Sequence, residues 1–164
     1  MKVKFSEKDI ESNRRRTADN GLISYLSLKE FNDLINKYFR DSEGDLHCAY
    51  SDEVITSRGK NGTLRLEHMI PVSMGGGTIL FNCVPAHDMV NGPSEKGDKY
   101  LLDWWIESKY FSQERLDRLV RYMLEAYEIT FSKKMDFESL GEETKEYIEE
   151  LEEIDKNKEH YVKT

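Results

Sequence analysis

Apolar residues recur at helical spacing in two segments of this chain, one in its first quarter and one in its second half. Ser27 precedes the first segment and Ser112 the second, and serine is a favoured N-cap because its hydroxyl accepts a hydrogen bond from the first helical turn. Glu30 adds the spacing of a capping box to Ser27. The pattern predicts two amphipathic helices that turn their apolar stripes to the core. The stripes are Leu28, Phe31, Leu34, Ile35, Tyr38 and Phe39, and then Leu116, Leu119, Val120, Met123, Leu124 and Tyr127.

A small sheet is predicted between these helices. Residues 47–56 favour an extended conformation, and Lys60-Asn61-Gly62 is a strong hairpin turn because Asn-Gly adopts the positive φ angles of short hairpin loops. Residues 64–70 follow as a strand. Pro71 ends that strand, since proline has no N–H to donate to a sheet ladder.

The next segment predicts a second strand and a helix. A glycine-rich loop at residues 74–77 leads to a strand at residues 79–84, which carries Asn82, and a helix is expected to start within residues 86–90. Together with the amphipathic helices, this order predicts an α+β fold. Its core is a strand, loop, strand and helix unit with a small β-hairpin, flanked by several α-helices.

Length and charge divide the chain into three predicted parts. Its 164 residues suffice for one hydrophobic core with terminal extensions. We expect an N-terminal helical region at residues 1–45, a core with its packing helices at residues 46–135, and an acidic helix at residues 136–164. The net charge is −8, and residues 136–164 carry −7 of it, so the body is nearly neutral. Phosphate contacts supply most non-specific nucleic-acid binding, so we expect weak intrinsic affinity for DNA or RNA.

The chain has the features of a cytoplasmic protein. No stretch approaches the roughly 18 apolar residues of a membrane span, and the N-terminus lacks the apolar core of a signal peptide. The two cysteines, Cys48 and Cys83, are far apart in sequence and fit a reducing compartment. We therefore expect free thiols, a cytoplasmic location and no membrane partner.

Residues 64–99 hold most of the side chains suited to chemistry. Glu67 and His68 are adjacent at the end of a predicted strand, and Asn82 and Asn91 follow the glycine-rich loop. A carboxylate and an amide oxygen are hard ligands that suit Mg²⁺ or Mn²⁺. An imidazole with an ordinary pKa of about 6.5 is largely neutral in the cell and can take a proton from water. The set allows phosphodiester hydrolysis, although each residue alone is more often structural.

The order of these residues resembles the HNH, or ββα-metal, nuclease motif. That motif reads acidic-His, Ile-Pro, a Gly-Gly loop, Asn, and then Asn or His nine residues later. The matching residues are Glu67-His68, Ile70-Pro71, Gly75-Gly76-Gly77, Asn82 and Asn91. The resemblance implies a ββα-metal core in this part of the chain.

The resemblance also implies a role for each matching side chain. His68 would be the general base. Glu67 and Asn91 would hold one divalent cation, Mg²⁺ first and Mn²⁺ second. Asn82 would brace the loop and orient the base.

Three departures from the family pattern stand out. The acidic residue is Glu67, where Asp or His is more usual. The segment after Asn91 is longer than in the common form, so either Lys96 or Lys99 would hold the scissile phosphate. Many relatives carry a structural zinc on two C-x-x-C pairs.

At those zinc positions this chain has Cys48 and Ser51, and His87 and Val90. Only two of these four can bind zinc, so no structural Zn²⁺ is expected.

Basic side chains outside the motif are candidate nucleic-acid contacts. Arg14, Arg15 and Arg16 form a cluster that fits either phosphate contacts or a solvated helix face. His87 fits either a surface position at a helix N-terminus or a nucleic-acid contact. The resemblance to HNH nucleases implies metal-dependent cleavage or nicking of DNA as the expected activity. RNA, including transfer RNA, is the second candidate, because no residue here reads a 2′-hydroxyl or a base edge.

A second class of function is a subunit whose site works only with a partner. Small proteins that resemble this one occur beside an ATPase in bacterial antiviral defence systems of the Septu type. The acidic segment 136–164 would then be a docking helix for that partner. The same segment also fits a solvated helix face or a phosphate mimic over the active site. The presence of base, ligands and lysines together favours an enzyme.

Overall fold

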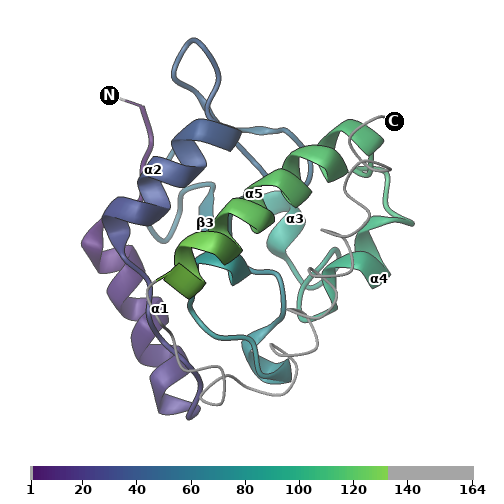
Figure 1. Cartoon of the computed structure of the whole chain (residues 1–164). Coiled ribbons are helices and arrows are strands. Elements are labelled where there is room, and N and C mark those ends of the chain that lie inside the picture. Colours follow the sequence, from purple (N-terminus) through teal and green to yellow (C-terminus); the bar gives the residue numbers. More distant parts are fainter. Residues whose placement is uncertain (1, 133–164) are drawn as a thin grey trace.

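The two predicted amphipathic helices pack against each other in the computed structural model, which describes residues 2–132. Helix α2 covers Leu28–Phe39, and helix α5 covers Gln113–Ser132 and crosses the molecule in Figure 1. Ser27 caps α2 as predicted, because its hydroxyl accepts a hydrogen bond from the backbone N–H of Glu30 at 3.4 Å. The acidic segment 136–164 lies outside the described residues, so its predicted helix stays a prediction.

The described residues form a mixed α+β fold, which confirms the predicted class. They contain five α-helices, two 3₁₀ helices (η1 and η2) and two antiparallel sheets of two strands each. No helix within residues 2–132 is long and apolar enough to span a bilayer. The other elements are α1 (Glu7–Asp19), β1 (Leu46–His47), β2 (Val54–Ile55), β3 (Leu64–His68), η1 (Val72–Met74), η2 (Leu80–Asn82), β4 (Cys83–His87), α3 (Asp88–Asn91) and α4 (Leu101–Trp105).

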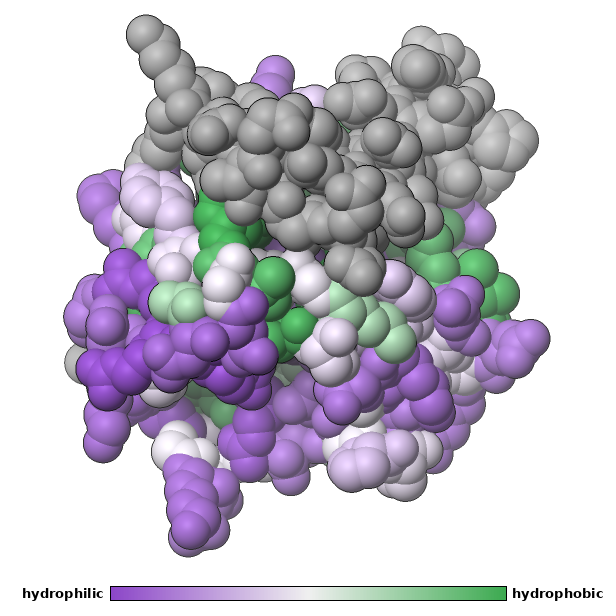
Figure 2. All heavy atoms as spheres, turned by 90° about the horizontal axis from the view of Figure 1, so that it is seen from below, coloured by the Kyte–Doolittle hydropathy of each residue, from purple (hydrophilic) through white to green (hydrophobic). Residues whose placement is uncertain are grey.

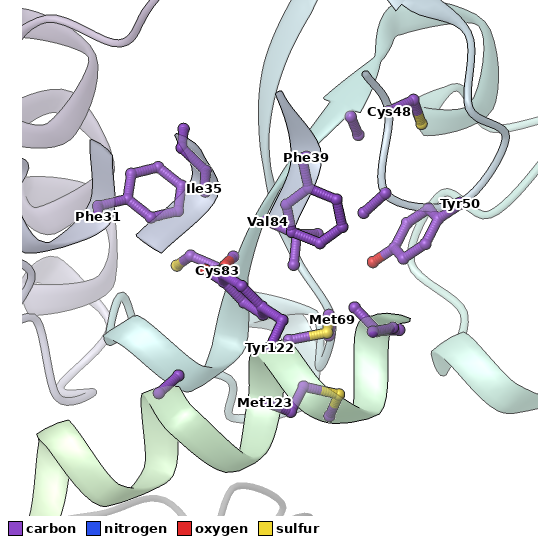
Figure 3. Packing of buried hydrophobic residues seen from close by; sticks show 14 of the residues in the cluster. Phe31, Ile35, Phe39, Cys48, Tyr50, Met69, Cys83, Val84, Tyr122 and Met123 are labelled. Carbon is purple, nitrogen blue, oxygen red and sulfur yellow. Dashed lines mark hydrogen bonds between the residues drawn. The ribbon is translucent and has the colours of Figure 1, made fainter. Parts of the chain in front are cut away.

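The hydrophobic core lies between α2, α5 and strand β4. Tyr122 of α5 lies beside Cys83 and Val84 of β4 (Figure 3), and its hydroxyl donates a hydrogen bond to the carbonyl oxygen of Cys83 at 2.6 Å. The ring of Phe39 from α2 packs on Tyr122 with 5.1 Å between centroids. Helix α5 thus fixes β4 through both packing and a buried hydrogen bond. Hydrophilic side chains cover most of the described surface on the face seen in Figure 2.

The two tryptophans belong to the core. Trp104 and Trp105 are both buried in α4. The indole N–H of Trp105 donates to the carbonyl oxygen of Tyr50 at 3.0 Å, which satisfies the one polar group of a fully buried ring. This contact ties α4 to the turn between β1 and β2.

The hairpin predicted around Lys60-Asn61-Gly62 is wrong, because the strands on its two sides belong to different sheets. Strand β1 pairs with β2, and the six residues between them form a turn in which Asp52 has a φ of +65°. The Asn61-Gly62 turn closes a local loop instead, in which the carbonyl oxygen of Ser57 accepts hydrogen bonds from Thr63 and Leu64. The continuous extended run expected at residues 47–56 is therefore wrong, because this turn interrupts it.

Strands β3 and β4 form the antiparallel pair next to the candidate site, with His68 opposite Cys83. The expectation of a strand at residues 79–84 with Asn82 inside it is wrong, because η2 occupies Leu80–Asn82 and β4 begins one residue later. Pro85 lies within β4 opposite Leu66. A two-stranded sheet tolerates this proline because each strand has one open side.

The glycine-rich loop is shaped by close packing, not by a need for flexibility. Gly75 has a φ of +94°, which side chains rarely adopt. A Cβ atom at Gly76 would lie 1.8 Å from the carbonyl oxygen of Ile70. The loop therefore folds back onto the end of β3 only because position 76 has no side chain.

Replacing Gly76 by alanine should destabilise the fold by about 3 kcal/mol, because the new methyl group meets backbone that cannot move aside. Gly92→Ala is the matched control, since a Cβ there meets nothing within 4 Å and its φ is −74°. Urea unfolding of both variants measures the difference. Equal stabilities for the two variants would contradict the close packing of this loop.

Candidate active site

A cleft of about 900 Å³ opens beside the end of β3. Its walls come from α1, the loop at residues 58–60, strand β3, η1 and the segment at residues 91–99. Most of the residues predicted from the motif lie in this one cleft, although they are far apart in sequence. They are Glu67, His68, Asn91, Lys96 and Lys99, together with Arg16 of α1.

Asn82 does not line the cleft but holds the backbone next to it. Its side chain is fully buried, and Oδ1 accepts a hydrogen bond from the N–H of Ile70 at 2.8 Å. Nδ2 donates to the carbonyl oxygens of Ile70 at 3.1 Å and of Gly77 at 2.9 Å. Asn82 therefore ties the glycine-rich loop to the backbone two residues after His68, which are the contacts expected of a bracing residue.

Hydrogen bonds determine which nitrogen of His68 carries the proton. Nε2 lies 2.9 Å from the hydroxyl oxygen of Thr78. That hydroxyl donates its own proton to the carbonyl oxygen of Asn13 at 3.1 Å, so it accepts one from Nε2. The lone pair is therefore on Nδ1, which receives a hydrogen bond from the guanidinium of Arg16 at 3.2 Å.

The surroundings of His68 keep its ring neutral. Burial lowers the pKa of His68 to about 3, and the nearby positive charges of Arg16 and Lys96 act in the same direction. The side chain is 4% exposed. The ring is therefore neutral, and the same burial and positive charges make it a weak proton acceptor in this arrangement.

Two buried side chains contact the same carboxylate oxygen of Glu67. The hydroxyl of Tyr50 donates to Oε2 at 2.8 Å, and Nζ of Lys96 lies 3.1 Å from the same atom. Lys96 is fully buried and also donates to the carbonyl oxygen of His68 at 3.2 Å. Burial raises the pKa of Glu67, and the Lys96 ammonium and the Tyr50 hydroxyl oppose that rise. Lys96 thus links the acidic residue to the predicted base.

The two candidate phosphate-binding lysines differ in their exposure to solvent. The ammonium of Lys96 is enclosed and already paired with Glu67, so in this arrangement it is not available to a phosphate. Lys99 is exposed at the cleft, and its Nζ donates to the backbone carbonyl of Glu95 at 2.9 Å. Of these two lysines, Lys99 is therefore the one that can reach a phosphate in the cleft.

The residue types at the cleft fit a hydrated Mg²⁺ better than Zn²⁺. Among the described residues, no group of three or more His, Cys, Asp or Glu side chains gathers to form a metal cage. Glu67 and Asn91 both line the cleft, and Tyr50 and Lys96 both contact the Glu67 carboxylate through Oε2. Mg²⁺ commonly keeps several waters and takes only one or two protein carboxylates or similar oxygens. Two oxygen ligands therefore suffice in principle.

The remaining predicted nucleic-acid contacts lie elsewhere. Arg14 forms salt bridges with Glu7 and Glu11, and Arg15 is exposed with its guanidinium 3.9 Å from Glu11. His87 caps α3 by accepting a hydrogen bond from the backbone N–H of Met89. None of Arg14, Arg15 and His87 lines the cleft.

Three basic residues of the cleft were not singled out from the sequence. They are Arg58, Lys60 and Arg65, which flank the Asn61-Gly62 turn. The signal for them was the presence of basic residues on both sides of a turn that leads into the motif. Their charges are partly balanced, because Arg58 pairs with Asp9 at 2.9 Å and Arg65 with Asp88 at 3.0 Å.

No family model, curated protein or solved structure matches this chain. The resemblance to HNH nucleases therefore rests on the ordered residues between Glu67 and Lys99. The structure adds a separate observation, which is that the acidic residue, the histidine and Asn91 of that order share one cleft.

Lys96→Met should destabilise the protein by about 3 kcal/mol, because it leaves a carboxylate buried without its cation. Lys99→Met removes an exposed lysine from the same segment and should change stability by less than about 0.5 kcal/mol. Adding Glu67→Gln to Lys96→Met should restore part of the loss, since the unpaired charge is then removed. Urea unfolding of the wild type and the three variants measures these differences in the free energy of unfolding. A Lys96→Met variant as stable as Lys99→Met would contradict the buried pairing of Lys96 with Glu67.

Proposed function

We propose that this chain is a metal-dependent endonuclease of the HNH type that hydrolyses phosphodiester bonds. DNA is the first substrate to test and RNA is the second. The observation that carries the proposal is the composition of one cleft, in which a neutral histidine, a carboxylate and an amide oxygen lie together with several cations. Proton acceptor, metal ligands and phosphate-binding groups are the parts that such hydrolysis needs.

His68 acts as the general base in this proposal. Thr78 keeps the proton on Nε2 and thereby fixes the lone pair on Nδ1, the nitrogen that would take a proton from a water molecule. Asn82 holds the backbone that follows, so the ring stays in place. A well-placed general base contributes about 10²- to 10⁴-fold to a hydrolysis rate.

Glu67 and Asn91 are the residues that would hold a divalent ion, Mg²⁺ or Mn²⁺. Tyr50 and Lys96 engage Oε2 of Glu67, so the carboxylate would reach the ion through Oε1. When bound, such an ion supplies positive charge to a phosphate oxygen and to the developing charge of the hydrolysis. The Lys96 contact also keeps Glu67 at a fixed position beside His68.

The cleft attracts a polyanion in spite of the acidic composition of the chain. Its cationic side chains belong to Arg16, Arg58, Lys60, Arg65 and Lys99, and Lys99 is exposed. Asp9, Glu67 and Asp98 also line the cleft, so basic side chains outnumber acidic ones there. An excess of one sign of charge concentrates ligands of the opposite sign. A nucleic-acid backbone fits this cleft better than a neutral or cationic substrate does.

Purified wild-type protein should nick or cut supercoiled plasmid, or cut RNA, with Mg²⁺ or Mn²⁺ and not with EDTA. His68→Ala should reduce this rate by about 10²-fold or more, because the general base is lost. His47→Ala is the matched control, since His47 pairs with Asp41 and lies outside the cleft. Equal cleavage by wild type and His68→Ala would remove the general-base assignment.

Asn91→Ala should weaken Mn²⁺ binding about tenfold, because one of two protein ligands is lost. Electron paramagnetic resonance of free Mn²⁺ in a titration measures this without any cleavage assay. Asn36→Ala is the control, since Asn36 is exposed on α2 and bonds to Arg40. An unchanged Mn²⁺ affinity in Asn91→Ala would argue against the proposed ligand pair.

A further inference from the structure

Arg16 makes an unusual contact for a cation in a basic cleft. It lies in the last turn of α1 and donates to Nδ1 of His68 at 3.2 Å, across 52 residues of sequence. Its neighbours behave differently, because Arg14 pairs with Glu7 and Glu11, and the guanidinium of Arg15 lies 3.9 Å from Glu11. Only Arg16 of the three is directed to the predicted base.

This contact covers the atom that the base must use. Nε2 of His68 is committed to the hydroxyl of Thr78, so Nδ1 is the only nitrogen with a free lone pair. The guanidinium of Arg16 occupies that lone pair. In this arrangement a water molecule cannot donate its proton to His68, whichever nucleic acid is the substrate.

The partner of Arg16 is a weak one for a guanidinium. Among the described residues, no carboxylate forms a salt bridge with Arg16, and its hydrogen-bond partner is an imidazole nitrogen instead of an anion. A phosphate offers two anionic oxygens that match the planar fork of an arginine. A phosphate group that enters the cleft therefore competes well for Arg16.

We propose that Arg16 covers the base in the free protein and moves to a phosphate group of the bound nucleic acid, which frees Nδ1 of His68. The inference rests on the proposed nuclease function and adds a mechanism by which the substrate would switch that activity on. The same side chain would hold the substrate and release the base. Water would then meet an accessible base only when a phosphodiester is present.

Nitrogen-15 NMR of the side chains tests the covered state without metal or cleavage. The chain has four histidines, and the His68 signals are assigned by their loss in His68→Ala. Arg16→Met keeps an unbranched, flexible side chain but removes the guanidinium and its N–H donors. In that variant the Nδ1 resonance of His68 should move to higher frequency, while Arg15→Met should leave it at the wild-type position. Unchanged signals from the other three histidines would show that the fold is retained.

A titration with a short DNA duplex in EDTA tests the release. Saturating DNA should move the Nδ1 resonance of wild-type His68 in the same direction as Arg16→Met does. Binding to Arg16→Met should also be weaker, with a salt dependence reduced by about one phosphate contact. An Nδ1 resonance that is the same in wild type and Arg16→Met, or that stays in place with saturating DNA, would overturn the inference.

These results can be separated from a failure of the proposed function. Metal-dependent cleavage without the NMR changes would leave the nuclease intact and remove the role of Arg16. A resonance that moves in Arg16→Met, in a wild-type protein that cuts neither DNA nor RNA, would support the covered histidine and count against the nuclease.

Discussion

The contact between Lys96 and Glu67 is the interaction on which the site depends. Burying an ammonium and a carboxylate is costly unless each finds a partner, and here each does so at 3.1 Å. Lys96 also donates a hydrogen bond to the carbonyl oxygen of His68. This one cation therefore joins the segment after Asn91 to strand β3, which carries Glu67 and His68. Tyr50 supports the same carboxylate oxygen from the β1–β2 turn.

A second constraint is the close approach of the glycine-rich loop to the end of β3. Gly76 lies against the backbone of Ile70, and Asn82 bonds to both the strand end and the loop. The loop also brings Thr78 to the ring of His68. The orientation of the His68 ring therefore depends on packing of the backbone, and α1 adds Arg16 to the candidate site.

Sequence patterns predicted the α+β class, the two amphipathic helices and the capping role of Ser27. They also selected Glu67, His68 and Asn91 from the residue order of a motif, and these three residues line one cleft. They could not predict that Lys96 is buried, since that depends on a partner 29 residues earlier in the chain. Element bounds failed at Asn82, where a 3₁₀ turn replaces the expected strand.

The arginine cluster shows a further limit of sequence patterns. Three consecutive helical residues point in different directions, so at most one of Arg14, Arg15 and Arg16 faces a given neighbour. The inward face of α1 is marked by Ile10 and by Thr17, and a buried threonine gives no hydrophobic signal. The choice of Arg16 therefore needed the three-dimensional structure.

The most direct test of the proposed site is a crystal structure of His68→Ala with Mn²⁺ and a DNA duplex, with the ion located by its anomalous scattering. One ion should lie about 2.1 Å from oxygens of Glu67 and Asn91, with a phosphate group in contact with Arg16. DNA bound away from this cleft, or an ion that contacts neither Glu67 nor Asn91, would contradict the proposed site.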